Sequence, residues 1–468
     1  MKKRIMACLC GILLLATAVG MIGCGGGSGG NSGDLVLWAG GQWIGEDAEN
    51  LQDFIDYVNE NYSGELGFEV KLEIKENLDV IFPTSLTNNS QPDLLLWGRN
   101  QTAEYASTDN FVNLDSYIED ADIDLSEFYE PALREGTYND SVYVLPMDVD
   151  PWGLIINMEI VREINKLADD PSSGYVALSE DGPATWSEFI TFGKMFRKYY
   201  TDKNQPVSSG YPLTDMSYHS FFSSAGWSFM SDPTSSSATA NFDSDVFRDF
   251  IDVFLEMRSV NVDCAGVGSQ TEFCNGSLAM MSASSYRCRY VSNYFGGDKV
   301  NGWKYVAQPA YDVDGEVQEG AKRGGLMGGF GWAIPQSGEQ YRTEAFYERV
   351  DMAWEFIRLT VTEDNLLKNW VNFCGSIPAL EKAQNFEEVT GTQYLAEMAE
   401  IAENCDIRPQ QYFVQQLDAQ FIAPAMQELT DLNTPVSNWT TEKLDDFIRR
   451  LNNNCNDFIE MSNSGLVG

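Results

Sequence analysis

The chain has 468 residues and carries 30 lysines and arginines against 70 aspartates and glutamates, a formal net charge of −40 at pH 7. This acid excess repels phosphate backbones, which argues against a nucleic-acid-binding function. About 435 residues follow the N-terminal segment described next, enough for two or three domains of roughly 100–200 residues each. The acids are dispersed between apolar segments, so they are expected mainly on the solvated surface.

The N-terminus has the pattern of a secretory signal. Three cations at residues 2–4 precede an apolar run over residues 12–21, which is shorter than the about 20 residues of a membrane-spanning helix. The end of this run resembles a bacterial lipobox, with Cys24 as its cysteine. Residues 1–23 are therefore predicted to be a signal peptide, and Cys24 is predicted to carry a lipid. A transmembrane helix or a chance cysteine is the alternative.

A flexible tether is predicted over residues 24–33, because residues 25–33 contain only Gly, Ser and Asn. Together with the lipid on Cys24, it would hold a folded body at the extracellular face of the cell membrane.

The cysteines and the histidine content argue against a structural zinc site. The chain has one histidine, His219, and no C-x-x-C pair. No metal and no cofactor is therefore expected. Disulfides and buried reduced thiols both remain open for the six cysteines after Cys24, which are Cys264, Cys274, Cys288, Cys374, Cys405 and Cys455.

The first part of the body reads as an α/β domain. Residues 35–38 form a short apolar run, and apolar residues between 51 and 58 recur at helical spacing. Residues 68–75 alternate between apolar and charged side chains, and residues 93–97 are almost continuously apolar, as in a strand covered on both faces. Ligands of open parallel sheets bind beyond the carboxyl ends of the strands, where residues 38–43 and 97–101 carry aromatic and amide groups.

A second α/β unit is predicted downstream. Thr185 and Glu188 form a capping box at the start of one amphipathic helix, and Phe247, Phe250 and Phe254 mark another. Residues 231–240 are small and polar, as in an exposed loop. The segment 426–451 is helical in pattern, with a loop near residue 434.

The order of several motifs resembles the extracellular solute-binding proteins of carbohydrate ABC importers, the maltose-binding-protein-like family. Each motif is weak alone, but their order and spacing behind a lipobox are specific. The motifs lie at residues 91–97, 145–146, 154–157, 183–189, 273–281, 328–335 and 353–357.

The resemblance implies an α/β, two-lobed periplasmic-binding-protein-like fold, with a mostly parallel sheet flanked by helices in each lobe and a ligand cleft between them. Lobe 1 would comprise residues 34–149 and 310–345, and lobe 2 residues 150–309 and 346–468. The chain would cross between lobes near residues 148–151 and 303–311. The implied function is that of a monomeric receptor, not an enzyme, which closes around an oligosaccharide and delivers it to an ABC importer.

The resemblance also implies the binding residues. Trp97 matches an aromatic of the family's sugar site, Asn100 replaces a carboxylate, and Gln42 and Trp43 replace an acid and a lysine, so maltose itself is not implied. Asp150 matches a ligand-contacting acid and Tyr286 a stacking tryptophan. Segments expected to face the cleft add Trp152, Trp227, Arg287, Phe330, Trp332 and Tyr412.

Each of these residues has a simpler interpretation. Trp97 and Tyr286 are also typical of core packing, Asp150 of a surface carboxylate or helix cap, and Arg287 of a surface salt bridge. A surface glycoside hydrolase is the enzyme alternative, but no carboxylate pair is singled out by its spacing. A receptor or sensor for a peptide, polyamine or other non-sugar ligand is a further alternative.

Overall fold

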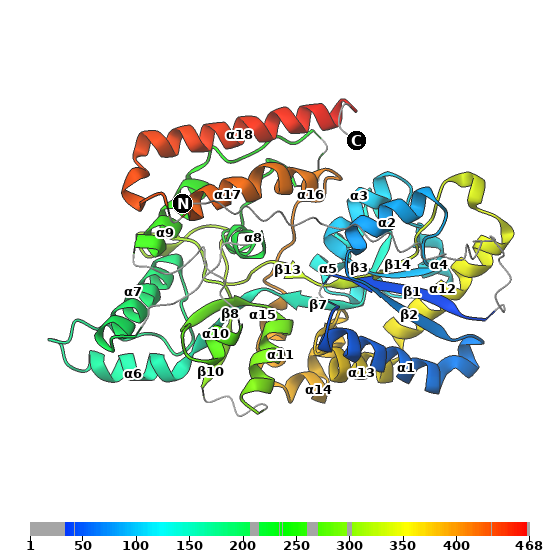
Figure 1. The fold of residues 1–468 in the computed structure, drawn as a ribbon, viewed down its shortest axis with the longest axis horizontal. Coiled ribbons are helices and arrows are strands. Elements are labelled where there is room, and N and C mark those ends of the chain that lie inside the picture. The colour runs from blue at the N-terminus through cyan, green and yellow to red at the C-terminus, as the bar shows by residue number, and fades with distance from the viewer. Residues whose placement is uncertain are drawn as a thin grey trace, which may run out of the picture.

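The computed structural model describes residues 33–41, 43–205, 215–233, 235, 237–259, 270–296, 302–431 and 433–465. Two lobes lie side by side, and each is built around its own β-sheet with helices packed on it (Figure 1). The expected two-lobed α/β fold is confirmed. Among the described residues, no helix combines the length and the apolar character needed to cross a membrane.

The sheet of lobe 1 has the strand order β2-β1-β3-β14-β6. β1 is parallel to β2 and β3, whereas β14 is antiparallel to β3 and β6. This confirms the strands expected near residues 35, 70 and 94. The bounds are β1 Leu35–Gly40, β2 Val70–Lys75, β3 Leu94–Gly98, β6 Val144–Pro146 and β14 Phe330–Ala333.

Both faces of this sheet are covered, as the apolar strands require. Leu37 and Leu94 point into one core, and Trp38 and Leu95 point into another on the opposite face, because side chains alternate along a strand. The first core includes α1 (Glu46–Leu66), α12 (Glu344–Thr362) and α13 (Asp364–Cys374). The second includes α2 (Leu78–Thr87) and α3 (Thr102–Ser107). Shorter elements of lobe 1 are η1 Arg99–Gln101, α4 Asp115–Asp120, α5 Glu130–Glu135, β4 Thr137–Tyr138 and β5 Ser141–Val142.

The sheet of lobe 2 has the order β10-β8-β9 and is antiparallel throughout. The expected mostly parallel sheet is therefore correct only for β2, β1 and β3 of lobe 1. The strands are β8 Gly153–Asn157, β9 Met280–Ala283 and β10 Trp303–Val306. The helices are α6 Met158–Ala168, α7 Trp186–Asp202, α8 Asp215–Ser224, α9 Asp245–Ser259, α10 Gln270–Cys274 and α11 Ser285–Tyr294. A hairpin of β11 (Asp312–Val313) and β12 (Glu316–Val317) follows.

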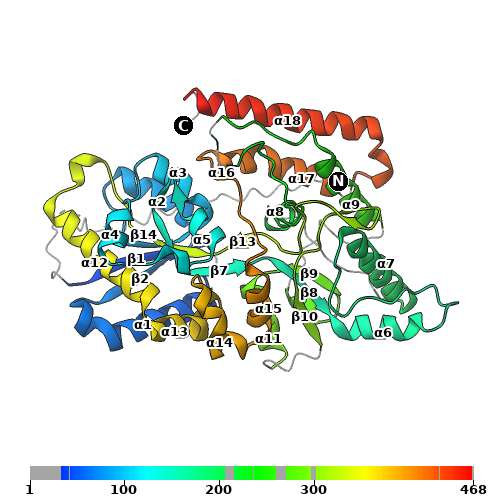
Figure 2. The same ribbon diagram turned by 180° about the vertical axis from the view of Figure 1, so that it is seen from behind.

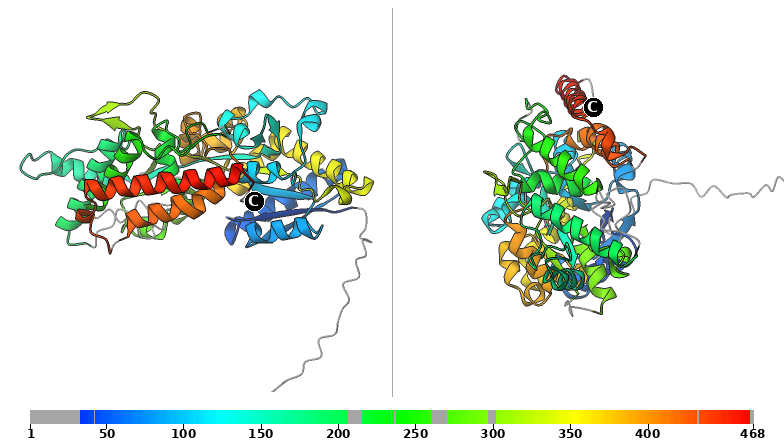
Figure 3. Two further views of the ribbon diagram at one scale, coloured as in Figure 1. Left: turned by 90° about the horizontal axis from the view of Figure 1, so that it is seen from above. Right: turned by 90° about the vertical axis from the view of Figure 1, so that its left-hand side faces the viewer.

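The C-terminal helices lie over lobe 2. α17 and α18 run alongside each other, and α16 continues toward lobe 1 (Figure 3). Leu451, Cys455 and Phe458 of α18 belong to the apolar core of lobe 2. The bounds of this group are α16 Val414–Leu417, a π-helical turn Asp418–Ile422, α17 Ala423–Thr430 and α18 Thr441–Asn463. Before them, α14 (Glu387–Thr390) and α15 (Gln393–Ala402) lie at the junction of the lobes, where α14 contacts α13 and α15 contacts β10 and β7 (Asp148–Pro151).

Strand β7 (Asp148–Pro151) crosses between the lobes. It pairs antiparallel with β13 (Met327–Gly328) on one side and with β15 (Ile377–Pro378) on the other. Figure 2 shows this junction from behind, with the segment that leads from α15 to α16 crossing β13. The predicted first crossing, near residues 148–151, has the bounds of β7.

Two expected boundaries need correction. Residues 346–374 were assigned to lobe 2 but form most of α12 and α13, whose apolar faces are buried against α1 and the lobe 1 sheet. Residues 303–306 were expected to cross between lobes but form β10, which pairs with β8 inside lobe 2. The return crossing comes later, at β13.

The described cysteines, Cys274, Cys288, Cys374, Cys405 and Cys455, are buried free thiols. They agree with the reduced-thiol alternative. Cys264, Cys24 and residues 25–32 of the tether lie outside the described residues.

Candidate ligand cleft

Asp150 lies on β7, between the lobes, and joins the crossing strand to α11. Its Oδ1 accepts a hydrogen bond of 2.7 Å from the backbone N–H of Ser285, the first residue of that helix. The carboxylate thus occupies the positive end of the α11 dipole. Asp150 is 6% exposed, and burial raises its pKa from 3.8 to about 6, although the Ser285 N–H opposes the rise.

Three further predicted residues lie around this junction. The Arg287 guanidinium stands 5.6 Å from the centre of the Trp152 ring, a cation–π distance, and its Nη1 donates to the carbonyl of Ser282 at 2.8 Å. Tyr286 follows Ser285 on α11 and is 38% exposed. We call these four residues the cleft wall: Asp150, Trp152, Tyr286 and Arg287. The wall combines an exposed aromatic side chain with fixed charged groups.

Trp43 and Phe330 come together on lobe 1, with ring centroids 5.5 Å apart. Trp43 is 2% exposed and also packs against Trp370 of α13 at 5.8 Å. A tryptophan enclosed in this way supports the core, so its expected ligand contact is corrected; Phe330 stays half-buried. The neighbouring candidate Gln42 lies outside the described residues.

Trp97 and Trp332 are also corrected from ligand contacts to core residues. Trp97 is 2% exposed and is enclosed by Phe82, Tyr105 and Phe111, because α2 and α3 cover this face of β3. Trp332 is fully buried on the other face of the sheet. Neither ring offers a face to a ligand in this conformation.

Asn100 and Tyr412 line one small cavity between the lobes. It lies between η1 and α3 of lobe 1 and the segment over residues 408–415. Across it, Gln415 Nε2 donates to the backbone carbonyl of Asn100 at 3.1 Å. Tyr412 is held in place by its hydroxyl, which donates to the Ser462 carbonyl of α18 at 2.8 Å.

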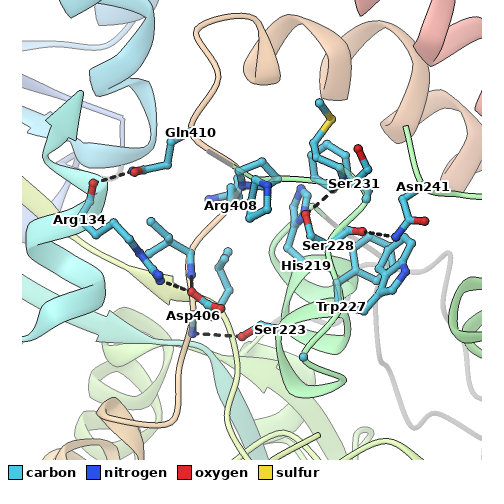
Figure 4. A pocket seen from close by; sticks show the side chains of 18 residues that line it. Arg134, His219, Ser223, Trp227, Ser228, Ser231, Asn241, Asp406, Arg408 and Gln410 are labelled. Atoms are coloured by element: carbon cyan, nitrogen blue, oxygen red, sulfur yellow. Dashed lines mark hydrogen bonds and ion pairs between the residues drawn. The ribbon is translucent and has the colours of Figure 1, made fainter. Parts of the chain in front are cut away.

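Trp227 lines a different cavity of about 360 Å³, shown in Figure 4. Arg408, Pro409 and Gln410 line both this cavity and the one at Asn100, so the chain at these residues separates the two. Trp227 therefore lies apart from Asn100 and Tyr412, contrary to the expectation that all three face one cleft.

Arg99 lies at the centre of the junction. No role was predicted for it from the sequence. It is 1% exposed and donates to the carbonyls of Asp148, Gly328 and Phe330 at 2.5, 2.7 and 2.9 Å. Its Nε lies 3.4 Å from a carboxylate oxygen of Glu135. Burial raises the pKa of Glu135, and the charge of Arg99 opposes that rise. A cation directly after an apolar strand was the available signal for Arg99.

Gly329 makes this arrangement possible. Its φ of +132° is strained for any L side chain, and a Cβ there would meet the Arg99 guanidinium and the Asp148 carbonyl, each at 2.6 Å. Only glycine can therefore occupy position 329, where the chain passes over Arg99.

The lobes are in contact on the cleft side. Arg289 of α11 forms an ion pair with Asp47 in the first turn of α1, and its Nη1 donates to the carbonyl of Cys374 at the end of α13 at 2.6 Å. With the Gln415–Asn100 contact, this ion pair joins lobe 2 to lobe 1. We call this arrangement, in which these contacts join the lobes, the closed clamp.

Within the described residues, no group of three or more His, Cys, Asp or Glu side chains is arranged to hold a metal ion. The cleft wall offers aromatic faces, the hydrogen-bond donors of Arg287 and one buried carboxylate, that of Asp150.

Comparison with known proteins places the chain in a family. Residues 58–397 match the family described as bacterial extracellular solute-binding proteins. The chain is 20% identical over 362 residues to the maltotriose-binding protein of Pyrococcus abyssi (strain GE5 / Orsay), an alignment that covers 76% of this chain and 69% of that protein.

Solved structures share the whole fold. The GacH receptor of Streptomyces glaucescens GLA.O, studied unliganded and with acarbose, matches with a TM-score of 0.71 and 14% identity over 92% of this chain and 99% of the receptor. UgpB from Mycobacterium tuberculosis, in complex with glycerophosphocholine, matches with a TM-score of 0.69 and 15% identity over 90% of this chain and 98% of UgpB. Because the family match extends over most of the sequence, this protein belongs to the bacterial extracellular solute-binding proteins.

Proposed function

We propose that this protein captures an oligosaccharide between its lobes by hinge closure and delivers it, as a monomer and without chemical turnover, to an ABC importer. The observation that carries the proposal is the cleft wall, which gathers Trp152, Tyr286 and Arg287 around the buried Asp150 where β7 crosses between the lobes.

The wall suits a sugar because sugars present apolar C–H faces flanked by hydroxyl groups. An exposed tyrosine supplies a stacking surface, and Trp152 can supply another where its face is not covered by Arg287. Guanidinium N–H groups and carboxylate oxygens bind hydroxyls with fixed geometry. Burial of Asp150 strengthens its hydrogen bonds relative to water.

The relatives support the same substrate class. The Pyrococcus protein is named for maltotriose and the Streptomyces receptor was studied with acarbose, while UgpB holds glycerophosphocholine. The fold therefore accepts ligands of more than one class. The aromatic wall favours the sugar for this chain.

The proposed location is the outer face of the cell membrane, with a lipid on Cys24 as the anchor. The supporting observation is Cys24 at the end of the N-terminal apolar run. In membrane fractionation, Cys24→Ser is expected to release the protein from membranes. The matched control Cys10→Ser, just before the apolar run, is expected to leave it there. Unchanged fractionation of Cys24→Ser would refute the anchor.

A thermal-shift panel tests the function. It compares linear oligosaccharides, monosaccharides, glycerophosphocholine, short peptides and spermidine. A ligand at 100 times its Kd stabilises the folded state by about 2.7 kcal/mol. We expect stabilisation by an oligosaccharide and no shortened sugars after prolonged incubation. Stabilisation by a peptide or amine alone would contradict the sugar, and release of shortened sugars would contradict a pure binding role.

A further inference from the structure

The cavity of about 360 Å³ beside the hinge is separate from the cleft wall. It lies between Arg134 of α5 in lobe 1, the segment over residues 406–410, and α8 with residues 226–231 in lobe 2 (Figure 4). Its volume is in the usual range of small-molecule sites, about 300–1,000 Å³. None of Asp150, Trp152, Tyr286 and Arg287 is among the residues that line it.

Three residues that line this cavity carry a fixed charge. Arg134 forms an ion pair with Asp406, and Arg408 also lines the cavity. A neutral ligand can bind without disrupting the pair between Arg134 and Asp406, whereas breaking an ion pair that a ligand buries is costly.

The neutral groups that line the cavity are of the kinds that bind polyhydroxy compounds. Trp227 and Phe229 provide aromatic surface, and Ser228, Asn241 and Gln410 provide hydroxyl and amide groups.

The cavity is also built across the hinge. Gln410 Nε2 donates to the backbone carbonyl of Arg134 at 2.7 Å, so one wall of the cavity is a contact between lobe 1 and the segment that leads to α16. A ligand that fills the cavity favours this arrangement of the lobes over any arrangement that changes its shape. In this arrangement the ion pair between Arg289 and Asp47 joins the lobes on the cleft side.

We propose that the hinge cavity, lined by Trp227, Ser228 and Gln410, is a second binding site for a neutral polyhydroxy compound of monosaccharide size, and that its occupation strengthens ligand binding in the cleft. The coupling follows from linkage, because both ligands favour the same arrangement of the lobes. The coupling rests on the proposed function, whereas binding in the cavity does not depend on that function.

Binding is tested in two variants of the full mature chain. Tyr286→Ala removes the exposed ring of the cleft wall, and Ser228→Phe fills the cavity. D-glucose, D-galactose and myo-inositol serve as probes in calorimetric titrations. We expect at least one probe to bind Tyr286→Ala with unchanged affinity and to bind Ser228→Phe at least tenfold more weakly. Binding that Ser228→Phe leaves unchanged, or an absence of binding to Tyr286→Ala, would overturn the site.

Coupling is tested by titrating the oligosaccharide found in the panel, with and without the saturating monosaccharide. We expect its Kd to fall at least threefold in the wild type and to stay unchanged in Ser228→Phe. An unchanged or raised Kd in the wild type would overturn the coupling. If Ser228→Phe does not fold, Ser228→Val adds less volume at the same position. If no oligosaccharide binds while the monosaccharide does, the proposed function fails and the cavity site stands.

Discussion

Replacing Arg99 by methionine tests the account of the hinge. The variant removes the donor to the carbonyls of Asp148, Gly328 and Phe330. It also removes the ion-pair partner of Glu135, which is 4% exposed. Removing one partner of a buried ion pair costs about 3–5 kcal/mol. We therefore expect Arg99→Met to lower the free energy of unfolding by about 3–5 kcal/mol.

Urea unfolding followed by far-UV circular dichroism measures this loss. Arg449→Met is the matched control, because Arg449 is exposed and, in the described part of the chain, pairs only with Asp446 on its own helix. It should change stability by about 0.5 kcal/mol or less. The double variant Arg99→Met/Glu135→Gln should recover part of the loss, with a coupling of about 0.5–3 kcal/mol. A loss of stability in Arg99→Met no larger than in the control would refute the role of Arg99 at the centre of the junction.

Three further outcomes are expected. Trp97→Ala should lower the free energy of unfolding in urea by about 3–5 kcal/mol, as for other buried aromatic side chains. A small loss would instead support the original prediction that Trp97 lines the cleft. Burial raises the pKa of Asp150 from 3.8 to about 6, so between these pH values the folded state binds more protons than the unfolded state, and stability falls as pH rises from about 4 to 6. The urea midpoint should therefore fall over this pH range in the wild type and change less in Asp150→Asn. An equal slope in the variant would contradict the assignment. Asp47→Ala removes the ion pair with Arg289 between the lobes, so small-angle scattering should show a larger radius of gyration without ligand; an unchanged radius would contradict the closed clamp.

The strands and helices of lobe 1 were predictable because their signals are local. The alternation over residues 68–75 and the helical spacing between 51 and 58 are set by which side of each element is buried. The strand directions in lobe 2 were not predictable, because β8, β9 and β10 pair across more than 100 residues of sequence. The placement of α12 and α13 on lobe 1 likewise depends on contacts with α1 far away in the chain.

The site residues show the same division. Trp97 and Tyr286 both lie at or just after a strand end, and nothing local to either residue distinguishes them. What separates them is that α2 and α3 cover Trp97, whereas Tyr286 stands on the first turn of α11 with its ring partly in solvent. Glu135 gave no signal, because its partner Arg99 is brought to it only by the fold.

Calorimetric titration of the oligosaccharide from the panel into wild type, Tyr286→Ala and Tyr294→Ala tests the central claim most directly. Tyr294 is a matched control, since it is exposed at the far end of the same helix. The account predicts at least a tenfold loss of affinity in Tyr286→Ala, about 1.4 kcal/mol, with ligand-free stability nearly unchanged, and no loss in Tyr294→Ala. Equal affinities in wild type and Tyr286→Ala would contradict a sugar-binding cleft wall at α11.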